Sequence, residues 1–221
     1  QFLGSTLYGG QGDDSITLDA VSSSYINGNK GNDILDIGDD GVFLDAEGLE
    51  FVNTNRITTI SNSSIFGGQG NDEIFLWGNF VNTVINGDLG DDYIGGKGTL
   101  SGFTASGNDG NDSVCGGLGD DTLYGNDGND LVAGNGGSDT LVGGLGADTL
   151  WGNYYPVVGR VNQEDGNNLF VFNSGDSFAA TAGAGDAVTF GNGVDYIADF
   201  TVGSDAIDFN GVIYDTSDEA F

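Results

Sequence analysis

Branched aliphatic residues recur at one fixed place in nine short glycine-rich units along the chain. Four units of nine residues follow one another without a gap from residue 116 to residue 151, a fifth begins at residue 107, and four more begin at residues 9, 28, 67 and 87. The eighth residue of every unit is aliphatic: Ile16, Leu35, Ile74, Ile94, Val114, Leu123, Val132, Leu141 and Leu150. A repeat of fixed period predicts a solenoid in which each unit stacks on the next.

The remaining positions of the unit predict how each turn is built. Positions 1 and 4 are always Gly and position 6 is always Asp, as in GNDGNDLVA at residues 125–133. Glycine permits positive φ and close approach of the backbone, so positions 1 to 6 predict a tight turn with inward carbonyl oxygens. Positions 7 to 9 predict a short strand whose central side chain alone faces the interior. We therefore expect an all-β protein, a right-handed parallel β-roll or β-helix solenoid with a carboxy-terminal β cap.

The spacing of the units predicts two unlike edges. From residue 107 the units start nine residues apart, so two of them make one 18-residue coil with alternate turns on opposite edges. The turns at residues 9, 28, 67, 87, 107, 125 and 143 form what we call the first edge, and those at residues 116 and 134 the second edge. The starts from 9 to 107 lie 19, 39, 20 and 20 residues apart, close to one or two whole coils. One degenerate rung is therefore expected on the first edge near residues 45–53.

In the amino-terminal half, segments rich in Ser, Asn and Thr replace the turns of the second edge. They place Ile26, Ile65, Ile85 and Ala105 two residues before the next unit, which is where Leu123 lies in the regular half. The expected organisation is a single-edged β-helix over residues 1–106 and a regular two-edged roll over 107–151. Residues 152–221, where the period dissolves, would form a capping region and the possible start of a secretion signal.

Charge points to a cation as the natural partner. The chain holds 34 Asp and Glu against 4 Lys and Arg, a formal charge of -30, which excludes nucleic acid as a partner. A solvated acidic surface of the halophilic kind is the alternative, but the acids here are periodic rather than scattered. The chain has no His and one Cys, Cys115, which exclude a catalytic zinc site, a serine–histidine relay and an internal disulfide framework. No apolar run predicts a transmembrane segment, and no secretory signal peptide is visible.

The repeated aspartates are the candidate metal ligands. Unit charges about 4.8 Å apart repel by roughly 3.5 kcal/mol at an effective dielectric of 20, so a cation must lie between stacked turns. Oxygen ligands on flexible turns favour Ca²⁺ over zinc, copper or Mg²⁺. The alternative is that these residues simply terminate turns. The candidate carboxylates are Asp14, Asp33, Asp72, Asp92, Asp112, Asp121, Asp130, Asp139 and Asp148.

Main-chain oxygens of positions 1 to 4 would complete each site. They are represented by Gly9, Gly28, Gly67, Gly87, Gly107, Asp109, Gly116, Gly125, Asp127, Gly134 and Gly143. Adjacent intact turns define six sites, five on the first edge and one between Asp121 and Asp139 on the second. The degenerate rung and the ends of the stack could add up to three, so about six to nine calcium ions are expected.

The nine units resemble the RTX (repeats-in-toxin) calcium-binding nonapeptide family, with its G-G-x-G-x-D-x-U-x pattern, where U is a large aliphatic residue. The stretch VDYIADFTVGSDAIDF at residues 194–209 resembles the segment that closes the apolar end of the roll in many members. The resemblance implies a secreted protein, extracellular or at the cell surface, exported by type I secretion through an uncleaved carboxy-terminal signal. The ending DTSDEAF is similar to such a signal in being acidic and then aromatic.

Three functions follow as hypotheses. The first is a non-enzymatic extracellular module of a surface layer, filament or adhesin, which folds on Ca²⁺ after export and contacts a second copy or a cell-surface partner. The second is the calcium-dependent secretion and folding domain of a larger protease, lipase or toxin. Catalysis by carboxylate pairs is the third, but calcium binding explains those residues better.

Position 9 residues point away from the core and are partly apolar. They would form an interaction stripe, or Tyr154 and Tyr155 would fold back over them. The residues concerned are Phe75, Cys115, Ala133 and Trp151 on one face, and Tyr124 and Val142 on the other. Cys115 could then join two subunits or remain an inert thiol.

Overall fold

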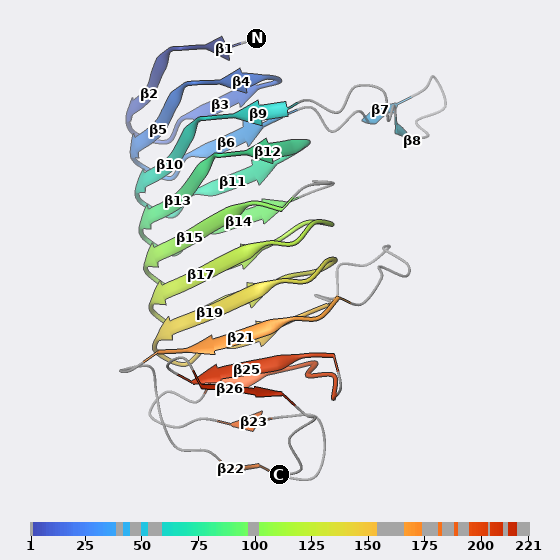
Figure 1. Ribbon diagram of the computed structural model, residues 1–221. Helices are drawn as coiled ribbons and strands as arrows, with labels where there is room; N and C mark the ends of the chain where they lie inside the picture. The colour runs from blue at the N-terminus through green and yellow to red at the C-terminus, as the bar shows by residue number, and fades with distance from the viewer. Residues whose placement is uncertain are drawn as a thin grey trace.

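Parallel strands stack into a β-solenoid in the computed structural model of this chain (Figure 1). The structure describes residues 2–38, 42–44, 50–52, 59–96, 102–153, 166–173, 181–182, 188–189, 195–202, 204–209 and 212–215. These residues contain strands and turns but no helix, which confirms the predicted all-β parallel solenoid. Over the same ranges, no helix is long and apolar enough to span a membrane.

The strands form three stacked sheets, which we name by their first strands. The β1 sheet has four strands: β1 (Phe2–Leu3), β4 (Val21–Ser22), β9 (Thr59–Ser61) and β12 (Asn79–Val81). The β2 sheet contains β2 (Thr6–Gln11), β5 (Tyr25–Lys30), β10 (Ser64–Gln69), β13 (Val84–Leu89), β15 (Thr104–Asp109), β17 (Thr122–Asp127), β19 (Thr140–Leu145), β21 (Leu169–Phe172), β25 (Ala206–Phe209) and β26 (Val212–Asp215). The β3 sheet contains β3 (Ser15–Leu18), β6 (Ile34–Ile37), β11 (Glu73–Leu76), β14 (Tyr93–Gly96), β16 (Ser113–Cys115), β18 (Leu131–Ala133), β20 (Thr149–Trp151), β24 (Tyr196–Ile197), β23 (Val188–Thr189) and β22 (Thr181–Ala182).

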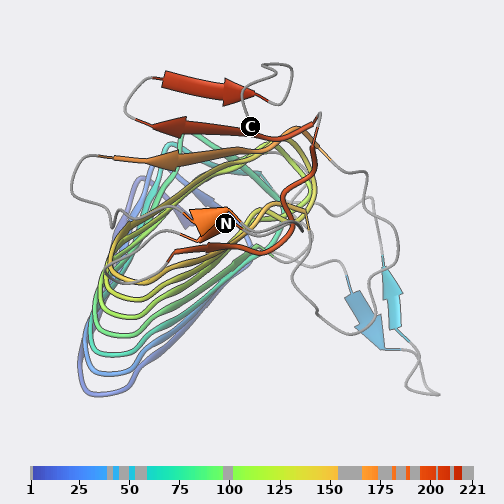
Figure 2. The ribbon, with the colours of Figure 1, turned by 90° about the horizontal axis from the view of Figure 1, so that it is seen from below.

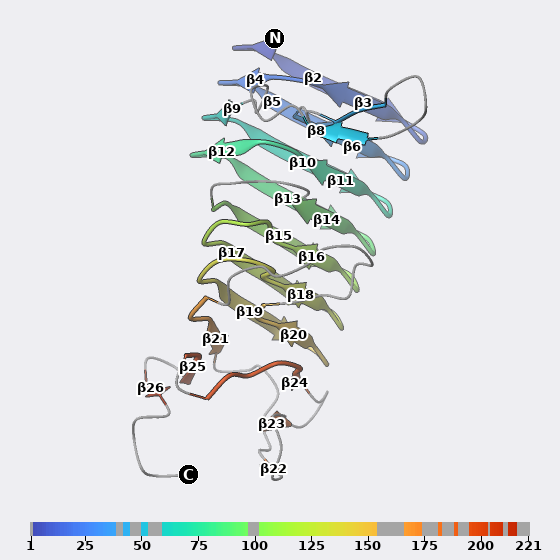
Figure 3. The same cartoon turned by 90° about the vertical axis from the view of Figure 1, so that its right-hand side faces the viewer.

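The coils change shape along the axis. Each amino-terminal coil passes through all three sheets, as β9, β10 and β11 do, whereas the coils from β15 onward use only the β2 and β3 sheets (Figure 3). In the amino-terminal half the second edge therefore carries a short sheet of its own, which the sequence predicted only as loops. Phe103 lies just after the change, and its ring packs 5.9 Å from that of Phe80 on the last three-strand coil.

The aliphatic ladder forms as predicted. Inside the β3 sheet, Leu35, Ile74, Ile94, Val114, Val132 and Leu150 follow one another in register and are fully buried. Inside the β2 sheet, Ile26, Ile65, Ile85, Ala105, Leu123 and Leu141 do the same, which confirms the predicted offset of the second-edge strands. Each rung thus buries its apolar residue only against the rungs above and below.

The interval of 39 residues between the units at 28 and 67 is one coil plus an insertion. Strand β5 pairs directly with β10, and β6 pairs directly with β11, so no rung lies between them. The predicted degenerate rung near residues 45–53 is therefore wrong. Residues 50–52 form β8 (Glu50–Val52), which pairs antiparallel with β7 (Val42–Leu44) in a hairpin that projects from the stack (Figure 2), and residues 45–49 and 53 lie outside the described residues.

The repeat also continues beyond residue 151, where the sequence suggested that it dissolves. Strand β21 pairs in parallel with β19 in the register Leu141 to Phe170, and β25 pairs with β21 in the register Phe170 to Ile207. On the other sheet β24 pairs with β20, with Ile197 opposite Leu150. Two strands of the stretch that resembles the family's closing segment, β24 and β25, therefore extend the two sheets, and β26 adds an antiparallel strand to β25.

Deletion of residues 39–57 should leave the solenoid folded. It joins Gly38 to Thr58 and leaves two residues between β6 and β9, as Trp77 and Gly78 do between β11 and β12. Because shortening a surface loop changes chain entropy only modestly, we expect the melting temperature with calcium to shift by no more than a few degrees. A control deletion of residues 64–72 removes β10 and the turn of Asp72 but leaves β9 and β11, so it breaks the register of one coil and should destabilise the protein strongly. Loss of the strand signal by circular dichroism in the first variant would show that the insertion belongs to the stack.

Candidate metal centre

Seven aspartates form a continuous row along the first edge, which we call the first row. Its members are Asp14, Asp33, Asp72, Asp92, Asp112, Asp130 and Asp148, each placed immediately before a strand of the β3 sheet. The backbone N–H of each donates to Oδ1 of the next, at N···O distances of 2.6 to 2.8 Å. All except Asp14 are buried. The structure therefore adds the pair Asp33–Asp72 to the pairs that the sequence placed together.

The second carboxylate oxygen of these residues lies inside the turn. In Asp14, Asp33, Asp72, Asp92, Asp112, Asp130 and Asp139, Oδ2 is buried and accepts no hydrogen bond. A buried carboxylate oxygen without a partner costs free energy unless a cation or proton neutralises it. The same arrangement in successive turns therefore indicates a row of cation sites.

The first glycine of each unit makes room for this oxygen. A Cβ placed on any of the nine position 1 glycines would collide with Oδ2 of the Asp of its own unit; at Gly9 the distance to Asp14 Oδ2 would be 2.9 Å. Position 4 has positive φ, as predicted, in eight of the nine units, for example 121° at Gly31, and Gly119 is the exception. Position 1 does not; position 2 has it instead, at residues such as Asn29 and Asp88. The expectation of positive φ at position 1 was therefore wrong, because that glycine is needed for space.

The second edge carries an equivalent row with mixed chemistry. The residue preceding each parallel strand of the β2 sheet is, in order, Ser5, Ser24, Ser63, Thr83, Phe103, Asp121, Asp139, Asn168 and Asp205. Several of these side chains repeat the same bond: Ser24 N–H donates to Ser63 Oγ at 3.2 Å, and Asp121 N–H to Asp139 Oδ1 at 2.8 Å. The predicted Asp121–Asp139 pair is thus adjacent.

Three residues that the sequence did not identify extend the rows. Asp148 N–H donates to Asp195 Oδ1 on the first edge, at 2.9 Å. On the second edge Asp139 N–H donates to Asn168 Oδ1 and Asn168 N–H to Asp205 Oδ1, each at 2.9 Å. A signal was present, since Asp195 and Asp205 each stand two residues before an Ile that enters the core, as position 6 stands before position 8.

A second series of hydrogen bonds links the position 5 residues of successive turns, at exposed positions on the outside of the stack. Here the later rung donates to the earlier one: Asn71 N–H to Asn32 Oδ1 at 2.9 Å, and Asn111 N–H to Asp91 Oδ1 at 2.8 Å. Position 5 is Asp or Asn in seven of the nine units, a regularity that could have predicted this ladder. The two ladders hold successive turns together without occupying the inward Oδ2 atoms.

Burial raises the pKa of most buried aspartates of the two rows above its usual value of 3.8, and six of them have values between about 6 and about 8. For Asp92 the pKa rises to about 7, because burial disfavours the charged form and the carboxylates of Asp112 and Asp72 repel it further. The corresponding values are about 6 for Asp72 and Asp112, about 7 for Asp130 and Asp139, and about 8 for Asp121. Without a counter-charge, these turns would have to take up protons in order to stack.

The donor set fits a hard oxygen-seeking cation such as Ca²⁺. Among the described residues no group of three His, Cys, Asp or Glu side chains lies together, so carboxylates alone could not fill a coordination shell. Ca²⁺ accepts carboxylate and main-chain carbonyl oxygens together in flexible geometry, and the turns supply both kinds. We therefore keep the nine Asp, with the main-chain oxygens of positions 1 to 4, as the candidate ligands.

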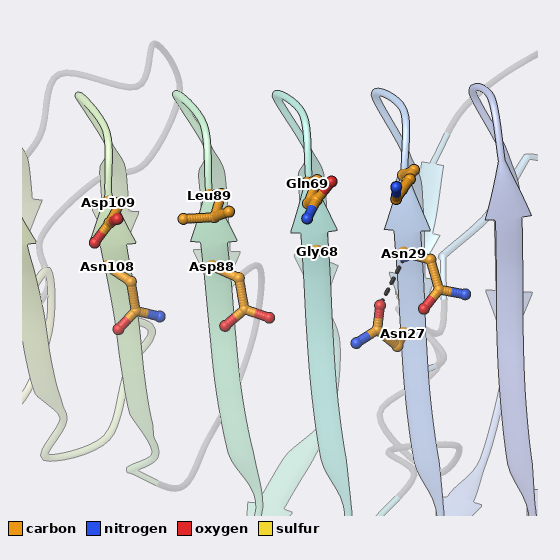
Figure 4. A pocket seen from close by; sticks show the side chains of 9 residues that line it. Asn27, Asn29, Gly68, Gln69, Asp88, Leu89, Asn108 and Asp109 are labelled. Carbon is orange, nitrogen blue, oxygen red and sulfur yellow. Dashed lines mark hydrogen bonds between the residues drawn. The ribbon is translucent and has the colours of Figure 1, made fainter.

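A hollow lies on the outer face of the β2 sheet, away from the row carboxylates. It encloses about 510 Å³ and is lined mainly by residues at positions 2 and 3 of four successive turns, including Asn29, Gln69, Asp88 and Asn108 (Figure 4). Asn27 Oδ1 accepts the backbone N–H of Asn29 at 2.7 Å beside it. These side chains lie on the outer face of β5, β10, β13 and β15, whereas the row carboxylates are buried inside the turns.

The outward apolar positions are largely covered. Cys115, Ala133 and Val142 are buried, which excludes an exposed stripe through them, although Tyr154 and Tyr155 lie outside the described residues. Burial also raises the pKa of the Cys115 thiol to about 11, so this cysteine is unsuited to joining two subunits.

Comparison with known families agrees with this geometry. A model of the RTX calcium-binding nonapeptide repeat matches the chain four times, at residues 5–20, 58–80, 106–141 and 133–153. No curated protein matches the chain. Asp33 and Asp92 fall outside the matched ranges, yet their hydrogen bonds place both within the same row as the matched aspartates.

Asp112→Ala should destabilise the calcium-loaded protein more than Asp14→Ala. Asp112 lies inside the row and accepts the backbone N–H of Asp92, whereas Asp14 forms the first rung. We expect a loss of about 2–3 kcal/mol for Asp112→Ala, the usual range for a buried hydrogen bond to a charged group, and less than about 1 kcal/mol for Asp14→Ala. Urea unfolding at saturating calcium measures both, and equal losses would contradict a row in which inner turns serve two sites.

Lower pH should promote folding of the metal-free chain. Asp72, Asp92, Asp112, Asp121, Asp130 and Asp139 each have a folded pKa above the unfolded value, so the folded state binds more protons and gains stability as pH falls through the folded pKa values. In calcium-free buffer, circular dichroism should show strand content that is low at pH 8 and increases toward pH 5.5. The reverse dependence, or none, would show that the carboxylates are not stacked in the metal-free fold.

Proposed function

Because the chain carries RTX calcium-binding nonapeptide repeats, we propose that it is a calcium-dependent structural module that works outside the cell and is not an enzyme. The row of buried Oδ2 atoms supports this proposal most directly, because each is matched to a glycine that leaves it space and none of the seven has a hydrogen bond. An enzyme would expose such groups to a substrate, whereas here neighbouring turns enclose them.

Calcium would act as a switch for folding. Stacked carboxylates repel one another, so the chain stays unfolded at cytosolic calcium and can be exported, as type I secretion requires. Extracellular calcium modules commonly bind with dissociation constants of roughly 10⁻⁴ to 10⁻³ M, which suits folding after export. The free energy of metal binding then becomes free energy of folding.

The proposed divisions follow from this role. Residues 1–106 serve as a single-edged calcium helix and residues 107–151 as a two-edged roll. Residues 152–221 first continue the two sheets through β21, β24 and β25 and then serve as a cap that leads into a secretion signal. A solenoid of this kind offers long sheet faces to a second copy of the chain or to a cell-surface partner, as in a surface layer, filament or adhesin.

Strand structure should depend on calcium at neutral pH. Circular dichroism of the purified chain should show little strand signal in chelator and a cooperative gain as calcium reaches the millimolar range, because only a cation offsets the stacked charges. Magnesium at the same concentration is the control and should be less effective, since it demands a rigid octahedral shell. Full strand content in excess chelator would refute the switch.

Association is tested separately. Light scattering of the folded protein at high concentration, with millimolar calcium, should show assemblies larger than one chain. A strictly monomeric protein would exclude self-assembly and leave a different cell-surface partner as the expected contact.

A further inference from the structure

Residues 152–171 form one repeat that is interrupted by a long insertion. Gly152 and Asn153 occupy positions 1 and 2, and Gly166, Asn167 and Asn168 occupy positions 4 to 6, with residues 154–165 between them. Leu169 then pairs with Thr140 in the register of every earlier rung. A Cβ on Gly166 would collide with the carbonyl oxygen of Gly137, as one on Gly137 would with that of Gly119 at 2.5 Å.

Asn168 provides one of the two functions of the usual position 6 aspartate, the acceptor for the backbone N–H of the preceding rung. Its Oδ1 accepts the backbone N–H of Asp139 at 2.9 Å, and its own N–H donates to Asp205 Oδ1 at 2.9 Å. The side chain is 1% exposed. Because the N–H of Asp139 needs an acceptor, this bond determines which end of the amide is the oxygen.

The other end of the amide lies where metal-binding turns have a carboxylate oxygen. A Cβ on Gly152 would come within 2.6 Å of Asn168 Nδ2, just as one on Gly9 would come within 2.9 Å of Asp14 Oδ2. Nδ2 donates to Asn153 Oδ1 at 2.5 Å. An N–H group cannot bind a cation. Where other turns have a carboxylate oxygen that could bind a metal, this turn has Asn168 Nδ2, which already donates a hydrogen bond.

The side chains near Asp139 in this row also offer no inward oxygen that is free to bind a metal. Phe103 precedes Asp121 in the row and offers no side-chain oxygen, while Asp121 Oδ2 accepts Gly117 N–H at 2.7 Å. Beyond Asn168, Asp205 Oδ2 accepts Thr201 N–H at 2.8 Å. Among the described turns of the second edge, only Asp139 has a buried Oδ2 without a hydrogen bond.

We propose that Asn168 ends the second metal row, so that the second edge binds a single cation between the turns of Asp121 and Asp139. The amide lets the next rung stack without a metal, because it adds no charge beside Asp139 and satisfies its own hydrogen bonds. This inference rests on the proposed calcium-binding function and specifies how many ions the second edge takes.

The test is a calcium count by equilibrium dialysis of the full chain. Asn168→Asp should bind one calcium ion more than the unsubstituted protein. Asn167→Asp is the matched control: it adds the same charge one residue away, at an exposed position 5 whose N–H donates to Ser138 Oγ, and should add no ion. An unchanged count in folded Asn168→Asp would overturn the proposal, and so would failure of this variant to fold at saturating calcium, since the new site should neutralise the new charge.

A second pair of variants tests the same claim without creating a charge. Asp139→Asn keeps the acceptor for Asp121 N–H and should lose one ion, whereas Asp205→Asn should lose none. Loss of an ion in Asp205→Asn would show that the row continues past Asn168. If the unsubstituted chain binds no calcium at all, the proposed function fails; if only the variant counts differ from expectation, the assignment of Asn168 alone is wrong.

Discussion

The structure depends on how each row aspartate divides its two carboxylate oxygens. Oδ1 accepts the backbone N–H of the preceding rung, so it sets the stacking of one turn on the next, as between Asp92 and Asp112. In Asp14, Asp33, Asp72, Asp92, Asp112 and Asp130, Oδ2 remains inside the turn, buried and without a hydrogen bond. The same residue therefore provides a bond that needs no metal and a charge that requires one, which couples stacking of the coils to cation binding.

The rest of the fold follows from that coupling. Each coil contributes few inward aliphatic side chains, and Ile74 or Ile94 is buried only when neighbouring coils are in place. Apolar burial and charge neutralisation are thus available only to a stack and not to a single unit. Ser24, Ser63 and Asn168 show the alternative solution on the second edge, because each accepts the backbone N–H of the preceding rung without adding a charge. Successive turns of that edge can therefore stack there without a cation of their own.

The solenoid fold and most of its strands could be predicted from the sequence, because they follow from residue types at fixed positions of the repeat. The invariant Gly and Asp positions and the aliphatic position predicted the parallel solenoid, and the offset of Ile26, Ile65, Ile85 and Ala105 predicted the second-edge strands. The prediction from spacing was wrong at the 39-residue interval, because this length fits two whole coils as well as one coil with an inserted hairpin. It failed again after Trp151, because an insertion within a turn hides Gly152 and Asn168 from a search for contiguous units. Only pairing of β19 with β21 reveals that the repeat continues.

The central claim is that cations lie between successive turns beside the buried Oδ2 atoms. The most direct measurement is anomalous diffraction from crystals grown with calcium, which locates the ions independently of any assumed geometry. The account predicts a row of peaks along the first edge between the turns of Asp14 and Asp148, and one peak between the turns of Asp121 and Asp139. A well-ordered solenoid with no peaks beside these carboxylates would contradict it.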